Sequence, residues 1–273
     1  MKHRKLIIII VLLFFPLIIF SVPDNTFLVT NEERPDFLVL TIPKSGTYLF
    51  DKLMKMILLE YQKETHITKK YLLQHCNGIT ANEFLNNRKK IITIRDMRDV
   101  CISLTLNFRK GFSDPNGRID FPQHYAAPYS YYYKWASELS LNIQLLNIID
   151  GNLLKPLDHC KVQSEAAKEW MKTPNTYVCR FENLIGEEGG GSKDLQIKEI
   201  KQILKFLNIN LSKDVIIYIA KNLYGNNIFK SKTFRRGEIG YWKEYFTEEH
   251  KQLFKEKLGK YLILWGYEKD NNW

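Results

Sequence analysis

The chain has 273 residues, of which 45% are hydrophobic and 13% aromatic, and it carries a formal net charge of +10 at pH 7. This length suits one large domain or two small ones, and the composition excludes an intrinsically disordered chain. The positive excess fits nucleotides, anionic substrates, nucleic acid or an acidic membrane surface as partners, and equally fits ordinary solubilising charge.

An uncharged hydrophobic run opens the chain. Residues 6–20 form the sequence LIIIIVLLFFPLIIF and follow a basic stretch at 2–5. With its continuation to residue 22 the run is about 17 residues long, the lower limit for a helix that spans a bilayer. We predict a signal-anchor or signal peptide over 1–22, and the poor cleavage pattern at 21–23 favours an uncleaved anchor. The basic flank predicts a single-pass membrane protein whose domain is translocated, into a secretory-pathway lumen or the cell envelope.

After a polar linker predicted over 23–35, buried strands alternate with helices. The apolar run 37–42 predicts a first strand, and apolar residues at helical spacing predict a helix over 46–60. The run 91–94 predicts a second strand, which a helix over 98–106 follows. We predict a third strand at 176–179 and further helices at 130–149, 194–207, 213–223 and 247–264. This alternation favours an α/β fold around a parallel sheet.

Two stretches predict loops. Residues 111–133 are rich in Gly, Pro and Tyr and predict a long loop that leads into a helix, whereas GEEGGGS at 186–192 predicts a flexible surface loop.

The four cysteines form no C-x-x-C pair, so we expect no zinc site. Cys101 and Cys179 lie in apolar stretches and are expected in the core. A Cys160–Cys179 disulfide could form in an oxidising compartment.

A first motif, TIPKSGTYL at 41–49, lies between the first strand and its helix. Gly46 permits close backbone approach, and the amides of Ser45, Gly46 and Thr47 would point at an anion at the helix start. Lys44 adds a positive charge. The segment lacks the G-x-x-x-x-G-K-[ST] pattern. It predicts an anion-binding loop, or alternatively a tight turn with a Ser/Thr N-cap.

A second motif, RDMRDVCIS at 95–103, follows the second strand. Arg95 ends this strand, where α/β folds bind ligands, and its guanidinium can grip a phosphate. Ser103 lies two turns into the next helix and could face the same phosphate. Asp96 and Asp99 have the spacing of an N-cap and its partner. The alternative is that Arg95 and the aspartates form surface ion pairs.

A third motif, FRRGEIGYW at 234–242, places two arginines before a glycine. Arg235, Arg236 and Gly237 could form another anion-binding element. The segment is too short to indicate a nucleic-acid patch. A solvated pair of charges is the alternative.

Together, in this order, the three motifs resemble the sulfotransferase family over roughly residues 36–267. The resemblance implies a domain over 36–273 with a P-loop-like, doubly wound, mainly parallel sheet and helices on both faces. It implies 3′-phosphoadenosine 5′-phosphosulfate (PAPS) as sulfuryl donor and no metal. The acceptor would be a hydroxyl or amine of a small molecule, glycan or lipid, in a pocket shaped by 111–133, with the membrane engaged through the N-terminal segment and no nucleic-acid partner.

The resemblance also implies roles for single residues. Lys44 would contact the bridging oxygen of PAPS, with Ser45, Gly46 and Thr47 on the 5′-phosphate. The 3′-phosphate would be held by Arg95, Ser103, Arg235, Arg236 and Gly237. Tyr48 and Phe181 stand near the positions of the family's adenine-packing aromatics, where this sequence departs from the usual residues.

The family's general base is a histidine roughly twenty residues before the arginine of the second motif. His75 stands at that distance from Arg95, and His66 is the alternative. A neutral imidazole is suited to accept a hydroxyl proton near pH 7. The rival functions are a membrane-anchored, non-catalytic nucleotide-binding module and a P-loop nucleotide kinase.

Overall fold

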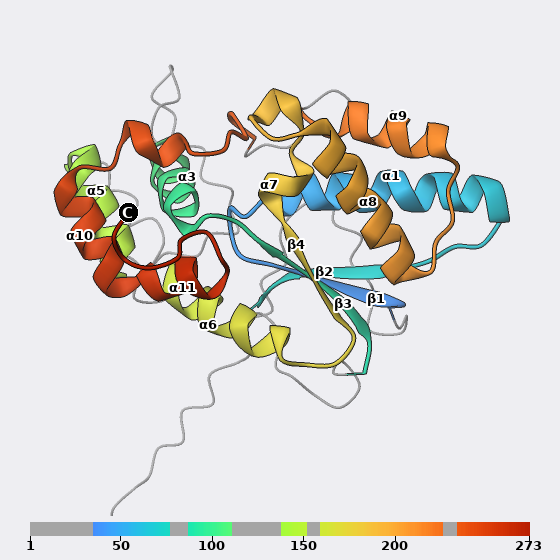
Figure 1. Ribbon diagram of the computed structural model, residues 1–273, viewed down its shortest axis with the longest axis horizontal. Coiled ribbons are helices and arrows are strands. Elements are labelled where there is room, and N and C mark those ends of the chain that lie inside the picture. The colour runs from blue at the N-terminus through green and yellow to red at the C-terminus, as the bar shows by residue number, and fades with distance from the viewer. Residues whose placement is uncertain (1–34, 77–86, 111–137, 152–158, 226–233) are drawn as a thin grey trace, which may run out of the picture.

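The computed structural model describes residues 35–76, 87–110, 138–151, 159–225 and 234–273 (Figure 1). The predicted membrane segment at 1–22, the linker up to residue 34 and the whole predicted loop at 111–133 lie outside these residues. At the centre is a four-stranded sheet in the order β2-β1-β3-β4, with every neighbouring pair parallel. Its strands are β1 (Phe37–Thr41), β2 (Tyr71–His75), β3 (Lys89–Ile94) and β4 (Thr176–Arg180).

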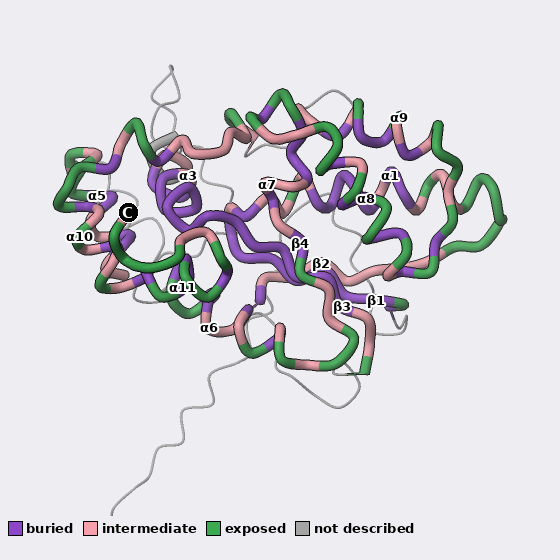
Figure 2. Tube along the Cα trace, viewed as in Figure 1, coloured by how far each residue is buried: buried purple, intermediate pink, exposed green. Residues whose placement is uncertain are grey.

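Strand β1 is buried along its whole length, as its unbroken apolar sequence requires of a strand covered on both faces. Its side chains alternate between two hydrophobic clusters. Phe37 and Val39 join one cluster, whereas Leu38 and Leu40 join the other. The sheet therefore separates two cores, and Figure 2 shows the strands as the most continuously buried part of the fold.

Three long helices cover the face of the sheet that bears Val39, and they gather on one side of Figure 1. They are α1 (Thr47–Thr65), α8 (Lys193–Leu207) and α9 (Lys213–Leu223). The last two begin at serines whose side chains accept a hydrogen bond from the helix backbone, which explains why their predicted starts were accurate to one residue.

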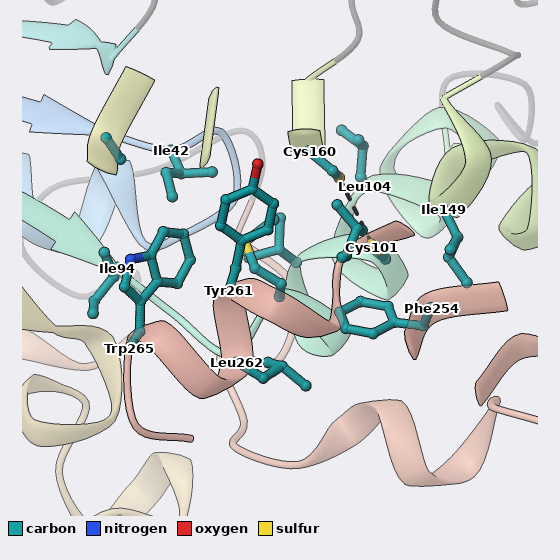
Figure 3. Packing of buried hydrophobic residues seen from close by; sticks show 14 of the residues in the cluster. Ile42, Ile94, Cys101, Leu104, Ile149, Cys160, Phe254, Tyr261, Leu262 and Trp265 are labelled. Carbon is teal, nitrogen blue, oxygen red and sulfur yellow. Dashed lines mark hydrogen bonds between the residues drawn. The ribbon is translucent and has the colours of Figure 1, made fainter. Parts of the chain in front are cut away.

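Five helices supply the second core. They are α3 (Met97–Lys110), α5 (Leu141–Asp150), α6 (His159–Met171), α10 (Glu248–Lys257) and α11 (Gly259–Leu264). Figure 3 shows this core, where Tyr261, Phe254 and Trp265 meet the strand and helix residues around Cys101. The helix predicted over 247–264 is broken at Leu258. Helix α5 begins at Leu141, after the Ser140 cap, and the start predicted for it at residue 130 lies outside the described residues.

The strand order creates a switch point at the carboxyl edge of the sheet. The chain leaves β1, passes through α1 to β2 on one side, and returns to β3 on the other side of β1. Ligands of open α/β sheets bind at such a point, outside the carboxyl ends of the strands. The doubly wound, mainly parallel sheet with helices on both faces is thus confirmed, and it places the first two motifs at the same edge.

All four cysteines are buried and free, which confirms Cys101 and Cys179 as core residues. The Cys160–Cys179 disulfide is not formed. Cys160 instead lies beside Cys101, with 3.6 Å between the two Sγ atoms (Figure 3).

None of the helices in the described part of the chain has both the length and the apolar character needed to cross a bilayer.

Candidate functional site

The loop after β1 is held in an unusual backbone conformation. Lys44 has φ 66° and Gly46 has φ 97°, both in the left-handed region. The Ser45 hydroxyl is buried and donates to the Ile42 carbonyl at 2.7 Å, and it lies 3.0 Å from Thr93 Oγ1 of β3. Ser45 therefore shapes the loop from inside and fixes it to the neighbouring strand. A non-glycine residue at positive φ costs about 1 kcal/mol, and such strain is typical of functional loops.

The start of α1 is open to an anion. Its N-cap is Gly46, no side chain caps it, and no acidic residue lies in its first turn. The predicted alternative of a Ser/Thr N-cap is therefore wrong. The first amides of the helix and the positive end of its dipole face outward without a built-in counter-charge.

Two aromatic side chains flank this helix start. A Cβ on Gly46 would lie 2.6 Å from the Phe181 ring, so only glycine fits against that ring. Phe181 is buried at the end of β4, whereas Tyr48 in the first turn of α1 is 43% exposed. Of the two predicted adenine contacts, Phe181 supports the loop from behind and Tyr48 is accessible.

His75 ends β2 directly beside the first motif. It pairs in register with Thr41, and its Nδ1 lies 3.0 Å from Thr41 Oγ1, which in turn lies 3.0 Å from Thr47 Oγ1. Burial lowers the pKa of His75 below its ordinary value of 6.5. Hydrogen bonding to Thr41 opposes this shift, and the positive charge of Lys44 adds to it. The imidazole is thus held neutral at pH 7.

His66 lies elsewhere. It is the exposed C-cap of α1, at the opposite end of the helix from Gly46. A helix of this length separates its two ends by about 27 Å. The structure brings His75, and not His66, to the carboxyl edge of the sheet.

One face of α3 runs along the site. Asp99, Ser103 and Asn107 are spaced four residues apart, so they share one side of the helix. Asn107 Oδ1 accepts a hydrogen bond from Lys44 Nζ at 2.7 Å, and Ser103 is partly buried between the other two. Sequence reasoning missed Asn107, although its spacing from Ser103 could have indicated it.

Arg95 joins three parts of the site. Its guanidinium donates to the Glu238 carbonyl at 2.7 Å and to the Lys44 carbonyl at 3.3 Å, and it lies 3.6 Å from the Asp99 carboxylate. It also stacks on Phe181 at 4.2 Å. Arg95 is only 7% exposed, so the predicted alternative of surface ion pairs is wrong. Its Nε is buried without a hydrogen-bond partner.

Asp99 ties the second motif to the third. Its carboxylate accepts from the Gly240 amide at 2.8 Å and from the Trp242 amide at 2.9 Å. Burial raises the pKa of Asp99, and Arg95 and these two amides oppose that shift. The predicted capping pair is therefore only half right: Asp96 accepts from the Arg98 amide at the helix start, but Asp99 serves the third motif.

The third motif presents two exposed arginines. The guanidinium carbons of Arg235 and Arg236 lie 5.4 and 4.6 Å from the Tyr241 ring centre, and Gly237 follows with φ 63°. Loss of hydration lowers the pKa of Arg235; Tyr241 opposes this, and the nearby charges of Arg95 and Arg236 add to it. The Arg236 guanidinium also lies 3.7 Å from the Glu238 carboxylate and 3.5 Å from that of Glu244, both on the exposed surface. The gathering of guanidinium groups makes this segment a candidate place for an anion.

Among the described residues, no cluster of three or more His, Cys, Asp or Glu side chains could hold a metal ion.

Comparisons with known proteins agree with this architecture. No protein-family model and no curated protein matches the chain. The crystal structure of the mouse sulfotransferase SULT7A1 complexed with PAP is 17% identical, and the match covers 84% of each chain with a TM-score of 0.56. Retinol dehydratase with androsterone and inactive cofactor PAP is 16% identical over 83% of this chain and 80% of that one, with a TM-score of 0.56. Retinol dehydratase in a complex with retinol and PAP is 17% identical, and the match covers 84% of this chain and 82% of that one with a TM-score of 0.56. The chain therefore has a sulfotransferase-like fold, as the resemblance of its motifs implied.

Proposed function

We propose that this chain transfers a sulfuryl group from PAPS to a hydroxyl or amine. The observation that carries the proposal is the convergence of Lys44, His75 and an uncapped helix start at one edge of a sulfotransferase-like sheet. Solved structures with this fold contain PAP, the adenosine 3′,5′-bisphosphate that remains when PAPS has lost its sulfuryl group.

The 5′ end of the nucleotide would lie over the start of α1. The first helix amides after Gly46 have no side-chain cap, so a phosphate can satisfy them and gain from the helix dipole. Lys44 stands at the rim of the same loop, where its ammonium can contact the oxygen that bridges phosphorus and sulfur. Ser45 supports this arrangement through its buried hydroxyl.

The 3′-phosphate would lie between α3 and the third motif. Arg235 and Arg236 offer exposed guanidinium groups, and Arg95 connects their segment to the loop of Lys44. Ser103 lies on the α3 face that borders this region. Bidentate arginine contacts to a phosphate are among the stronger hydrogen bonds in proteins.

Positioning and electrostatics would then carry the reaction. If His75 donates from Nδ1 to Thr41, its Nε2 is left to accept the proton of the acceptor hydroxyl or amine. The acceptor atom attacks sulfur, the bond from sulfur to the phosphate oxygen breaks, and Lys44 offsets the charge on that oxygen. Holding the groups in line supplies most of the rate enhancement in transfers of this kind.

Two measurements test the proposal. Calorimetry should detect PAP binding to the purified chain, and labelled PAPS offered with phenols, sugars, hydroxylated lipids and amines should yield a sulfated product. Absence of PAP binding would overturn the proposal. Binding without transfer to any acceptor, and without release of sulfate, would instead favour a non-catalytic nucleotide-binding module.

We also propose that residues 1–22 attach the chain to a membrane, on the basis of their uncharged sequence and basic flank. Protease protection of the chain in sealed vesicles tests both attachment and orientation. Complete digestion with no membrane-retained fragment would contradict attachment.

A further inference from the structure

We propose that the glycine-rich turn at 186–192 is the platform that positions the third motif, and that Gly189 thereby sets the preference for nucleotides that carry a 3′-phosphate. This inference rests on the proposed function, because it assigns the third motif to that phosphate. Gly189 acts through the backbone of the third motif and is a positioning residue.

The turn has a defined, hydrogen-bonded conformation, where its composition predicted a flexible loop. It contains the 3₁₀ helix η3 (Glu187–Gly189). Three main-chain hydrogen bonds close it: the Gly190 amide donates to the Glu187 carbonyl at 2.9 Å, and the amides of Gly191 and Gly189 donate to the Gly186 carbonyl at 2.8 and 3.2 Å. The buried Gln196 of α8 lies under Gly186 and donates to the Leu184 carbonyl at 2.8 Å. The turn is therefore anchored to the sheet's helical layer.

The third motif rests directly on this turn. The Ile239 amide donates to the Gly189 carbonyl at 3.0 Å. A Cβ on Gly189 would lie 2.6 Å from the Gly237 carbonyl oxygen and 2.2 Å from Ile185 Cγ1. Contacts this short do not occur with real Cβ atoms, and one of the two partners is backbone. Any side chain at Gly189 would therefore displace the segment that carries Arg235 and Arg236.

Other contacts show why a displacement here would reach the arginines. Tyr224 donates to the Arg236 carbonyl at 2.5 Å, Arg95 holds the Glu238 carbonyl, and Asp99 holds the Gly240 and Trp242 amides. The motif is thus fixed on both sides of Gly237, and the Gly189 contact lies between these points. Pushing the middle outward changes the direction of the neighbouring arginines while their outer anchors stay in place.

The consequence for ligands is selective. The third motif would contact the 3′-phosphate, whereas the 5′-phosphate would lie over the start of α1. A shifted third motif should therefore lose affinity for PAP and keep its affinity for adenosine 5′-monophosphate, which lacks the 3′-phosphate. Loss of one charge-assisted hydrogen bond corresponds to roughly tenfold in affinity or more.

The experiment compares both nucleotides by calorimetry on the full chain and its Gly189→Ala variant. We expect PAP affinity to fall about tenfold and adenosine 5′-monophosphate affinity to change less than about twofold. Gly190→Ala is the matched control. A Cβ there meets nothing within 4 Å, so this variant should keep the wild-type ratio of affinities despite the strain of its φ of +82°.

The outcomes separate the inference from the function on which it rests. If the wild-type chain binds no PAP, the proposed function fails. If the wild-type chain prefers PAP and Gly189→Ala keeps that preference in full, the proposal that the turn at 186–192 positions the third motif is overturned. Should Gly189→Ala fail to fold, the double variant with Ile185→Ala removes the 2.2 Å clash and leaves the one with the Gly237 oxygen. Compared with Ile185→Ala alone, it should still lose preference for PAP, and an unchanged preference would overturn the platform.

Discussion

Arg95 lies between β3 and α3, and Arg98 lies in the first turn of α3, yet the surroundings of these two arginines differ in kind. Arg98 pairs with Asp96 and Glu268, each at 2.7 Å, and its guanidinium lies between the rings of Trp242 and Trp273 at 4.2 and 4.4 Å. Arg95 has an ion pair of 3.6 Å with Asp99 and an Nε without a partner. The charge of Arg98 is balanced by the protein, so that region is built for stability.

The region around Arg95 is paired more weakly. Lys44, Arg95, Arg235 and Arg236 gather there, and Asp99 accepts from two backbone amides as well as pairing with Arg95. The carboxylates nearest Arg236 are those of Glu238 and Glu244, at 3.7 and 3.5 Å on the exposed surface. Buried or crowded positive charge is costly unless an anion balances it. The contrast between the two arginines therefore distinguishes a cation with close ion pairs that stabilise the fold from a more weakly paired group of cations at the proposed phosphate sites.

The largest effect is expected on the stability side. Arg98→Met removes a buried cation and leaves Asp96 and Glu268 facing each other without it. Breaking such a network should lower the free energy of unfolding by about 3 kcal/mol, measured by urea denaturation. Arg235→Met is the matched control, because its exposed guanidinium has no carboxylate partner among the described ion pairs. Similar losses in both variants would contradict the distinction.

On the ligand side, the largest effect should come from Lys44→Ala. The ammonium would act mainly on charge that develops in the transition state, so turnover of labelled PAPS should fall roughly 100-fold or more. PAP affinity should change much less. Lys243→Ala changes an exposed lysine beyond the third motif and should leave turnover unaltered. Unchanged turnover in Lys44→Ala would remove the lysine from the mechanism.

A smaller loss is expected from the exposed arginines. Arg235→Ala and Arg236→Ala should each weaken PAP binding about tenfold, since each removes one charge-assisted contact. Binding of adenosine 5′-monophosphate should stay the same, and thermal unfolding should show no loss of stability. A variant that binds both nucleotides equally less well would place its arginine outside the 3′-phosphate site.

The same contrast shows what the sequence could and could not predict. The strand–loop–helix units around Gly46 and Arg95 were predictable, because buried apolar runs and helical spacing are local signals. Strand β2 was missed, since its five residues are all only partly buried and carry no clear pattern.

The contacts that organise the site are long-range and left no local signal. Asp99 meets Gly240 and Trp242 across 141 and 143 residues, and Lys44 meets Asn107 across 63. The turn around Gly189 was predicted to be flexible from its glycines. In the structure Gly186 and Gly189 are needed because neighbouring side chains and backbone come too close for a Cβ, whereas a Cβ on Gly190 would meet nothing within 4 Å.

The smallest effect concerns pH and His75. Its pKa is lowered in the folded chain, so between the folded value and 6.5 the unfolded chain binds more protons than the folded one. The contribution of His75 to the free energy of unfolding should therefore be fully present above pH 6.5. It should decrease on acidification through that window, by about 1.4 kcal/mol for each unit of pKa shift. His75→Gln should lack this acid-side loss in urea denaturation at pH 7 and pH 5. His66→Gln is the control, since that side chain is exposed, and should behave as the wild type does.

The activity of the wild type should decline only below pH 6.5, because the base works in its neutral form. An activity profile that declines already above pH 6.5 would show that His75 is not held neutral by the burial and the Lys44 charge that surround it.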